Sequence, residues 1–242
     1  MATDLSRYKH IVVLTGAGVS AASGLPTYRG AGGLWERDGL ASLATEEAWQ
    51  KTPNEVWKLF GGLRSQVRAV DPNGAHTALA QMEELACGDF TLITQNVDGL
   101  HGRAGSKNVI ELHGNIHQTR CSDAECKSDS FTDEAEYAEV PLCSLCSAIL
   151  RPDIVLFGEA LPVLADHLAT RALRDCDLFI AVGTSGTVSP ASRFVRSAEY
   201  AGAHTMFVNL EPMEQGGSAF KEQFIGKADE LLPEIFLSSV AA

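Results

Sequence analysis

Four cysteines have the spacing that most directly indicates chemistry. Cys121 and Cys126 form one pair, and Cys143 and Cys146 form a second pair after sixteen intervening residues. Two thiolate pairs separated by a ribbon-sized segment suit tetrahedral zinc, and four protein ligands predict a structural ion rather than a catalytic one. An iron–sulfur cluster is the alternative, although its usual tighter run of cysteines is missing. His117 is a spare ligand candidate.

Small residues after the apolar run 10–15 indicate a phosphate-binding turn. They fit the pattern G-x-G-x-x-[GA], whose glycines let backbone N–H groups approach a pyrophosphate. An ordinary dinucleotide site also needs an acid at the end of the next strand, and Glu36 and Asp38 follow no strand-like run. We therefore do not expect a hydride-transferring dehydrogenase. The residues of this turn are Gly16, Ala17, Gly18, Val19, Ser20 and Ala21.

Polar residues follow two further apolar runs. Gln95, Asn96 and Asp98 come after one run, and His113 comes after the next. A neutral imidazole is the natural base for a hydroxyl proton near neutral pH, so His113 is the predicted base and His101 the runner-up.

Two later strand ends carry candidate ligand contacts. One offers N–H and hydroxyl donors to a phosphate, or simply caps the helix that follows. The other offers an amide and a carboxylate to a ribose, or is a plain turn. These residues are, in order, Gly183, Thr184 and Ser185, then Asn209 and Glu211.

The elements that must position these residues alternate between strands and helices. Apolar runs predict strands buried on both faces at 10–15, 90–94, 109–112, 177–183 and 204–210. Helical patterns lie between several of them, at 75–87, 162–174 and 190–201. The alternation predicts an α/β fold with a Rossmann-like, doubly wound parallel sheet.

Two segments interrupt this alternation. Residues 27–73 read as a helical insert and residues 117–150 as a zinc ribbon, and together they are expected to form a smaller lobe. The large lobe would then comprise about 8–26, 74–116 and 151–240 of a single catalytic domain spanning 1–242.

Composition limits the possible partners and locations. The net charge of −12 argues against sequence-independent nucleic-acid binding, and no apolar stretch is long enough for a membrane span. Residues 1–10 lack the apolar core of a secretion signal, so we expect a reducing, cytoplasmic environment. The two remaining cysteines, Cys87 and Cys176, are then expected as core thiols.

Seven motifs in order resemble the sirtuins, the NAD-dependent protein-lysine deacylases. They are "GAGVSAASGLPTYRG", "TQNVDGLH", "ELHGN", the four-cysteine ribbon, "RPDIVLFGE", "VGTSGTVSP" and "VNLEP", and the resemblance runs from about residue 8 to about residue 237. It implies NAD as co-substrate, one structural zinc ion and acyl-lysine proteins or peptides as substrates. The implied products are nicotinamide, free lysine and O-acyl-ADP-ribose.

The resemblance also assigns roles to residues. His113 is the implied base, with Asn96 and Asp98 in the same catalytic pocket. Residues 26–29 belong to a loop that closes over the nicotinamide ribose, and Tyr28 replaces the family's usual Phe. The implied NAD contacts are Gly16, Ala17, Gly18, Ser20, Pro26, Thr27, Tyr28, Arg29, Trp35, Gln95, Asn96, Asp98, Gly183, Thr184, Ser185, Asn209, Leu210, Glu211 and Ala228.

The substrate residues follow from the same resemblance. Peptide pairing is expected along a strand end, mostly through backbone groups; its residues are Val155, Phe157, Gly158 and Glu159. Desuccinylases of this family clamp the acyl carboxylate with a Tyr and an Arg three apart. Those positions fall on Phe60 and Leu63 here, so we expect acetyl or a longer neutral acyl group; a one-residue slip of the alignment would reinstate Arg64 and an acidic acyl group.

Two rival functions share some of these features. A sirtuin-like mono-ADP-ribosyltransferase would use the same NAD residues, and His113 favours deacylation over it. A zinc-ribbon binding module without catalysis is disfavoured by the acidic charge and by the full set of polar strand ends.

Overall fold

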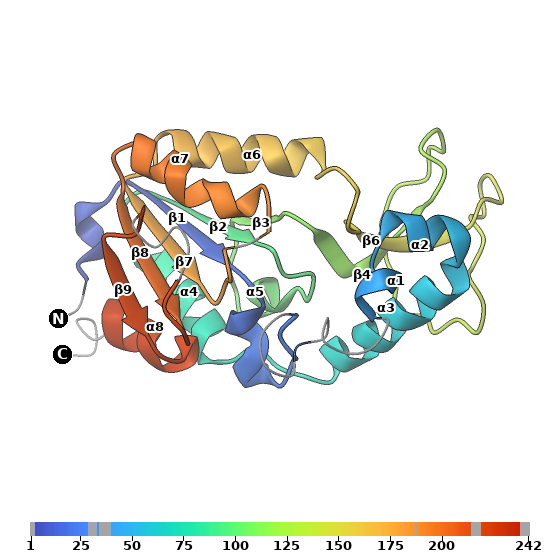
Figure 1. Ribbon diagram of the computed structural model, residues 1–242, viewed down its shortest axis with the longest axis horizontal. Helices are drawn as coiled ribbons and strands as arrows, with labels where there is room; N and C mark the ends of the chain where they lie inside the picture. Colours follow the sequence, from blue (N-terminus) through green and yellow to red (C-terminus); the bar gives the residue numbers. More distant parts are fainter. Residues whose placement is uncertain (1–2, 29–32, 34–39, 187, 214–218, 238–242) are drawn as a thin grey trace.

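The computed structural model describes residues 3–28, 33, 40–186, 188–213 and 219–237. They build a six-stranded sheet covered by helices and, beside it, a three-stranded sheet packed against a second group of helices (Figure 1). The Thr3 N–H donates to the Ile235 carbonyl at 2.7 Å, so the two ends of the described chain meet at the side of the large sheet away from the smaller one (Figure 1). No helix within these ranges has the length and apolar character that a membrane span requires.

The large sheet is parallel throughout, as the sequence predicts. Its strands run in the order β3-β2-β1-β7-β8-β9. Because β1 lies between β2 and β7, the chain winds in one direction from β1 to β3 and in the other from β7 to β9, which makes the end of β1 a topological switch point. The strands are β1 (His10–Thr15), β2 (Asp89–Thr94), β3 (Val109–Glu111), β7 (Leu178–Val182), β8 (His204–Asn209) and β9 (Glu222–Ile225).

Helices cover both faces of this sheet (Figure 1). Alternate residues of β1 serve different layers, since Ile11 and Val13 join one core cluster and Val12 and Leu14 the other. The first cluster packs under α4 (Gly74–Leu85) and α8 (Ala228–Phe236), and the second under α6 (Val163–Arg174) and α7 (Phe194–Tyr200). Burying each such aliphatic side chain contributes about 1.5–3 kcal/mol, so the central strand is held from both sides.

The start of the central strand is also fixed by a distant carboxylate. The backbone N–H groups of Lys9 and His10 donate to the two oxygens of Asp177, at 2.8 and 3.0 Å. Asp177 directly precedes β7, so this contact joins the beginnings of two neighbouring strands that lie far apart in sequence.

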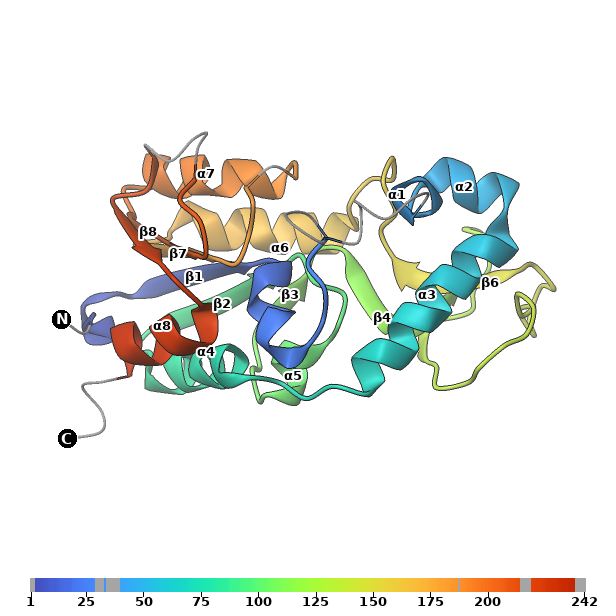
Figure 2. The same cartoon turned by 60° about the horizontal axis from the view of Figure 1, so that its bottom comes forward.

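The smaller group of elements combines the two interrupting segments (Figure 2). Its antiparallel sheet has the order β5-β4-β6, with β4 at Gly114–Cys121, β5 at Phe131–Thr132 and β6 at Leu150–Ile154. Its helices are α1 (Leu40–Leu43), α2 (Glu46–Lys51) and α3 (Pro53–Arg68). Trp49, Trp57 and Phe60 share a third core cluster with Ile116 and Leu150, so the helices and the ribbon pack as one unit. The expected residue limits of the two lobes stay a prediction.

A buried ion pair joins α3 to the ribbon. Arg64 lies 3.2 Å from an Asp133 carboxylate oxygen, and the two side chains are only 5% and 3% exposed. Arg64 also donates to the carbonyls of Ile116 and Gln118 and to the Thr119 hydroxyl. Burial alone opposes ionisation of Asp133, but hydrogen bonds from Thr119 and from a backbone N–H, together with the Arg64 charge, lower the pKa of Asp133.

Several local expectations need correction. The helix expected at 75–87 ends at Leu85, and Cys87 is exposed, so the prediction that it is a core thiol was wrong; Cys176 is buried as expected. The helix expected at 190–201 is a short 3-10 turn, Ala191–Arg193, followed by α7. Edge strand β9 lacks the apolar run that identifies the other strands and was not predicted.

The stretch after β1 forms neither a loop nor a long helix. It is a 3-10 helix, Ala17–Ser23, which ends at Gly24 in the left-handed region with φ of 91°. Two other short helices lie at Leu5–Arg7 and, as α5, at Leu100–Arg103.

Candidate active site

The candidate site lies where five parallel strands, β1, β2, β3, β7 and β8, end at the same edge of the large sheet. Thr15 is paired with Thr94 on one side and with Val182 on the other, so β1, β2 and β7 end in register. Beyond these ends the Gly16 N–H donates to the Val182 carbonyl at 3.1 Å, and the Gln95 N–H donates to the Thr15 carbonyl at 3.0 Å. The residues that follow each strand are thereby held close together.

Glycines allow this close packing of the strand ends. The Gly18 N–H donates to the Gly183 carbonyl at 2.9 Å, and a Cβ on Gly18 would lie only 2.8 Å from the Gly183 Cα. Gly183 itself has a φ of +58°, which favours glycine. The two glycine-containing motifs therefore fit against one another, and any side chain at Gly18 would force the two turns apart.

A buried polar network lies beneath this edge. The Ser20 hydroxyl donates to Asp98 at 2.7 Å and accepts from the Asn96 amide at 3.1 Å. The Asn96 amide also donates to the Gly16 carbonyl at 3.2 Å. Asn96 is 3% exposed, and its Oδ1 has no hydrogen-bond partner within the described part of the chain. A buried acceptor without a partner fits a ligand that brings an N–H or O–H donor, such as a carboxamide or a ribose hydroxyl.

His113 follows β3 and has a defined tautomer. Its Nδ1 lies 2.9 Å from the Gln95 carbonyl oxygen, which can only accept, so Nδ1 carries the proton. The lone pair is therefore on Nε2. Burial lowers the pKa of His113, and the hydrogen bond to Gln95 opposes this only in part. The ring is accordingly neutral and able to accept a proton at neutral pH.

Two further buried histidines, His76 and His101, belong to the network, and the sequence did not indicate that they lie together. The His76 Nδ1 accepts from the Asn73 N–H at 3.2 Å, so its Nε2 carries the proton and lies 3.4 Å from the Ser20 hydroxyl. The His101 ring lies 4.9 Å from the His76 ring, and its Nε2 is 2.9 Å from the Thr15 hydroxyl. Burial lowers the pKa of His76 to about 4 and that of His101 to about 3.

These contacts change the expectation for His101. It is 2% exposed and its Nε2 is already bonded to the Thr15 hydroxyl, so this nitrogen is not open to a ligand as that of an alternative base would be. The one sequence signal that could have identified His76 is a capping box. Asn73 caps helix α4, and the residue at the third helical position, here His76, often bonds back to the cap.

The adenosine side of the predicted site is built from β7 and β8. The Gln95 amide donates to the Thr184 hydroxyl at 2.9 Å, which links it to the nicotinamide side. The Asn209 amide donates to the Glu211 carbonyl at 3.3 Å, and Leu210 between them is exposed. The remaining residues predicted here are Ser185, which is exposed, and Ala228, which is buried at the start of α8.

The predicted closing loop is described only in part. Pro26, Thr27 and Tyr28 are half-buried beyond the 3-10 helix. Burial raises the pKa of the Tyr28 phenol, and the nearby Asp98 charge raises it further, which places the ring close to the polar network. Arg29 and Trp35 lie outside the described residues.

The predicted substrate segment leads from β6 towards α6. The Val155 N–H donates to the His113 carbonyl at 2.9 Å, so the segment lies next to the candidate base. Phe157 forms an isolated parallel bridge with Thr45, in which its N–H and carbonyl bond to residues 44 and 46. Its backbone N–H and carbonyl are therefore already paired within the chain, and pairing of this segment with a peptide stays a prediction. Its side chain is 42% exposed.

Glu159 has a structural partner inside the molecule. Its carboxylate forms an ion pair with Arg151, which is 5% exposed, and accepts from the Leu156 N–H at 2.8 Å. Although burial alone raises it, the pKa of Glu159 is lowered overall by these hydrogen bonds and by the arginine charge. The side chain of Glu159 thus holds the turn at 156–159 in shape.

The four predicted zinc ligands come together, although they belong to two distant parts of the ribbon. Their sulfur atoms all lie within 4.8 Å of one another. Cys121 and Cys146 are 3.5 Å apart and Cys126 and Cys143 are 3.8 Å apart, sulfur to sulfur. Zn–S bonds of about 2.3 Å in a tetrahedron place sulfurs about 3.8 Å apart, so the cluster fits zinc. His117 is not part of this group.

Comparisons with known proteins agree with this geometry. The model of the Sir2 family matches residues 16–190. A protein of Pasteurella multocida (strain Pm70), named NAD-dependent protein deacylase, is 44% identical over 231 residues, covering 95% of this chain and 97% of that protein. NAD-dependent protein deacylase 2 of Pyrobaculum aerophilum is 43% identical over 232 residues, which cover 96% of this chain and 91% of that protein.

Solved structures give the same result. A structure described as a Sir2 homolog–NAD complex has a TM-score of 0.87 and 39% identity, covering 95% of this chain and 89% of that one. A structure described as Sir2 with a p53 peptide and NAD+ has a TM-score of 0.83 and 31% identity, and the match covers 98% of this chain and 96% of that one. Because the family model matches most of the chain and these relatives are more than 40% identical over nearly all of it, the chain belongs to the Sir2 family.

Proposed function

We propose that this protein is an NAD-dependent protein-lysine deacylase. The observation that carries the proposal is the orientation of His113, whose Nδ1–H is held by the Gln95 carbonyl while Nε2 keeps its lone pair. Transfer of an acyl group from a lysine amide to a ribose hydroxyl of NAD needs such a neutral base at the site that holds the dinucleotide. The names of the Sir2 relatives support the same activity.

The residues present fit NAD at the switch point of the sheet. The glycine turns at Gly16–Gly18 and Gly183 would lie along the pyrophosphate, and the Asn96 Oδ1 would accept a hydrogen bond from the nicotinamide or its ribose. Asn209 and Glu211 would hold the distal ribose. When bound, NAD supplies a sugar carbon that loses nicotinamide and takes up the acyl oxygen of the substrate.

In this proposal the protein contributes positioning and one proton transfer. Asp98 is fixed by the hydroxyl of Ser20 and by the Leu100 N–H at 2.9 Å, so its carboxylate is oriented before any ligand arrives. His113 takes a ribose hydroxyl proton at Nε2 while Nδ1 stays bonded to the Gln95 carbonyl. The Tyr28 ring excludes water from this end of the site.

The same geometry favours an uncharged acyl group. Phe60 and Leu63 carry no charge, and Arg64 is committed to Asp133 and to three other acceptors on and near β4. The alternative alignment, in which the Arg64 guanidinium would bind an acyl carboxylate, is therefore unsupported. We propose acetyl, or a longer neutral acyl group, as the preferred substituent.

A panel of matched peptides tests the proposal. Purified protein is incubated with NAD and an acetyl-, succinyl- or long-chain acyl-lysine peptide, and nicotinamide and O-acyl-ADP-ribose are measured by mass spectrometry. We expect O-acyl-ADP-ribose from the neutral acyl peptides and its near absence in H113A. ADP-ribose attached to the protein or peptide, without loss of the acyl group, would indicate a transferase instead.

Three expectations from the sequence accompany this proposal. The cysteine cluster is proposed to hold one structural zinc ion, given the sulfur separations. The absence of direct nucleic-acid binding and the cytoplasmic location stay predictions.

A further inference from the structure

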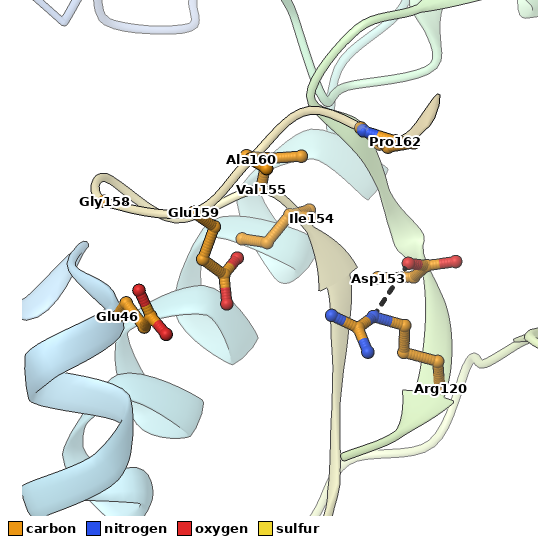
Figure 3. Close-up of a pocket in the computed structure, with 10 residues that line it drawn as sticks. Glu46, Arg120, Asp153, Ile154, Val155, Gly158, Glu159, Ala160 and Pro162 are labelled. Carbon is orange, nitrogen blue, oxygen red and sulfur yellow. Dashed lines mark ion pairs between the residues drawn. The ribbon is translucent and has the colours of Figure 1, made fainter. Parts of the chain in front are cut away.

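A cavity of about 460 Å³ opens beside the proposed substrate segment (Figure 3). Its lining includes residues 153–155 and 158–160, together with Gly114, the residue after His113. A peptide that places its acyl-lysine near His113 would therefore have neighbouring side chains next to this cavity. The roles proposed above use the backbone of this segment and leave the charged side chains of the cavity wall without a function.

Most charges in the cavity wall are already balanced. The Arg120 guanidinium lies 3.1 Å from an Asp153 carboxylate oxygen, as the dashed line in Figure 3 marks. The Glu159 carboxylate is paired with Arg151 behind the wall. Each of these groups has an opposite charge beside it, so they contribute little net field to a passing peptide.

Glu46 is the exception. Within the described ranges no lysine, arginine or histidine lies within ion-pair distance of its carboxylate, and its closest polar partner is the neutral Gln50 amide at 3.4 Å. The carboxylate lies at the side of the cavity formed by the start of α2 (Figure 3). Among the described lining residues, Glu46 is therefore the one charged group without an opposite charge beside it.

Gly158 leaves the space between Glu46 and the substrate segment open. Its φ of +100° favours glycine, and a Cβ at this position would lie 3.6 Å from both the Cβ and the Oε2 of Glu46. With no side chain there, the carboxylate borders directly on the backbone segment beside which a substrate would run. An extended peptide could reach Glu46 with a long side chain while its backbone stays next to Gly158.

We propose that Glu46 is a specificity-determining residue that pairs with a lysine or arginine flanking the acyl-lysine of the substrate. This inference rests on the proposed deacylase function and adds the kind of sequence that the enzyme prefers. The alternative role for Glu46 is to stabilise the first turn of α2, as acids at helix N-termini do. Glu47 occupies the same turn, pairs with Lys51 and does not line the cavity.

This pair of neighbours gives a matched control. Acetyl-lysine peptides with alanine, arginine or glutamate at each flanking position are compared by kcat/KM at low and high salt. For the wild-type protein we expect a basic flank to raise kcat/KM roughly two- to fivefold over alanine at one position, as one partly exposed ion pair allows. The preference should shrink near 1 M salt, where the Debye length is about 3 Å.

The variants separate the two roles of Glu46. In E46Q the ratio between basic and alanine peptides should fall to about one, and in E46K it should reverse in favour of glutamate. E47Q loses an acid from the same helix turn and should keep the wild-type ratio. Turnover without a basic preference, or a preference that survives E46Q, would overturn this inference alone. Absence of turnover with every peptide would overturn the proposed function and this inference with it.

Discussion

His113 uses one ring nitrogen to hold its orientation and keeps the other for a proton. The Nδ1 bond to the Gln95 carbonyl fixes the tautomer, and burial lowers the pKa of the ring below its ordinary value of 6.5. The protonated ring, which cannot act as a base, is therefore favoured only below pH 6.5. The direction of this shift keeps the base active in mildly acidic conditions.

The pH dependence of the reaction follows from this. We expect kcat/KM for an acetyl peptide to stay near its maximum as the pH falls through 6.5, and to decline only below it. H113A should lose about 10²–10⁴ in kcat where the wild-type rate is at its maximum and show no such decline, so the difference between the two proteins should narrow at low pH. Steady-state rates across the pH range check this, and a wild-type decline that is centred above pH 6.5 would contradict the assigned base.

Acyl selectivity is a second property of single residues. Replacing Phe60 by tyrosine and Leu63 by arginine would supply a hydroxyl and a guanidinium one helical turn apart on α3, beside the fully engaged Arg64. We expect F60Y/L63R to gain roughly tenfold or more in kcat/KM for a succinyl peptide, as a charged hydrogen-bond pair contributes about 1.5–3 kcal/mol. K58R, a change at an exposed position of the same helix, serves as the control. No gain on succinyl peptide would show that these two positions do not face the acyl group.

The elements of the small lobe depend on one another through the cysteine cluster. Cys121 ends β4, whereas Cys143 and Cys146 lie on the loop before β6, so a shared ion would join segments that the chain connects only through a long loop. Cys121 and Cys143 also belong to the core cluster that contains Trp49 and Trp57. Loss of the metal should therefore disturb the packing of these tryptophans.

Metal removal tests this dependence. We expect one zinc ion per chain by elemental analysis, and we expect chelation or C126S to abolish deacylation and to change the tryptophan fluorescence. C87S alters an exposed cysteine outside the cluster and should keep both metal and activity. Full activity of a metal-free protein would contradict the structural role of the ion.

The sequence predicts best those elements whose signal is local. β1, β2, β7 and β8 are recognised because each is a short apolar run buried on both faces, and the cysteines because their spacing is itself the signal. β9 escapes because three of its four residues are exposed and it pairs at the sheet edge. The pairing of Arg64 with Asp133 and the contact of His76 with Ser20 join residues that are 69 and 56 positions apart, which no local pattern specifies.

At the scale of the whole molecule, the proposed NAD site joins segments that are far apart in the sequence. Strand ends 16–20, 95–98, 183–185 and 209–211 all contribute to it. Ligand binding at such a junction stabilises the native state as a whole, because the unfolded chain does not hold the strand ends together.

A thermal-shift titration measures this stabilisation. At about 100 times its Kd, NAD should add about 2.7 kcal/mol, which corresponds to roughly 5–10 °C in Tm for a chain of this size. N96A, which lacks the buried amide at the centre of the network, should show a smaller shift at the same NAD concentration. A Tm that does not depend on NAD concentration would contradict the site.

The position of β1 at the centre of the sheet also affects how the protein is made. Its two neighbours are β2 and β7, and the contact between Lys9 and Asp177 spans 168 positions. At about 5–20 residues per second, a ribosome needs on the order of ten seconds to extend the chain from β1 to β7. Throughout that interval one side of an apolar strand has no partner to hydrogen-bond with, which leaves it open to non-native strand pairing.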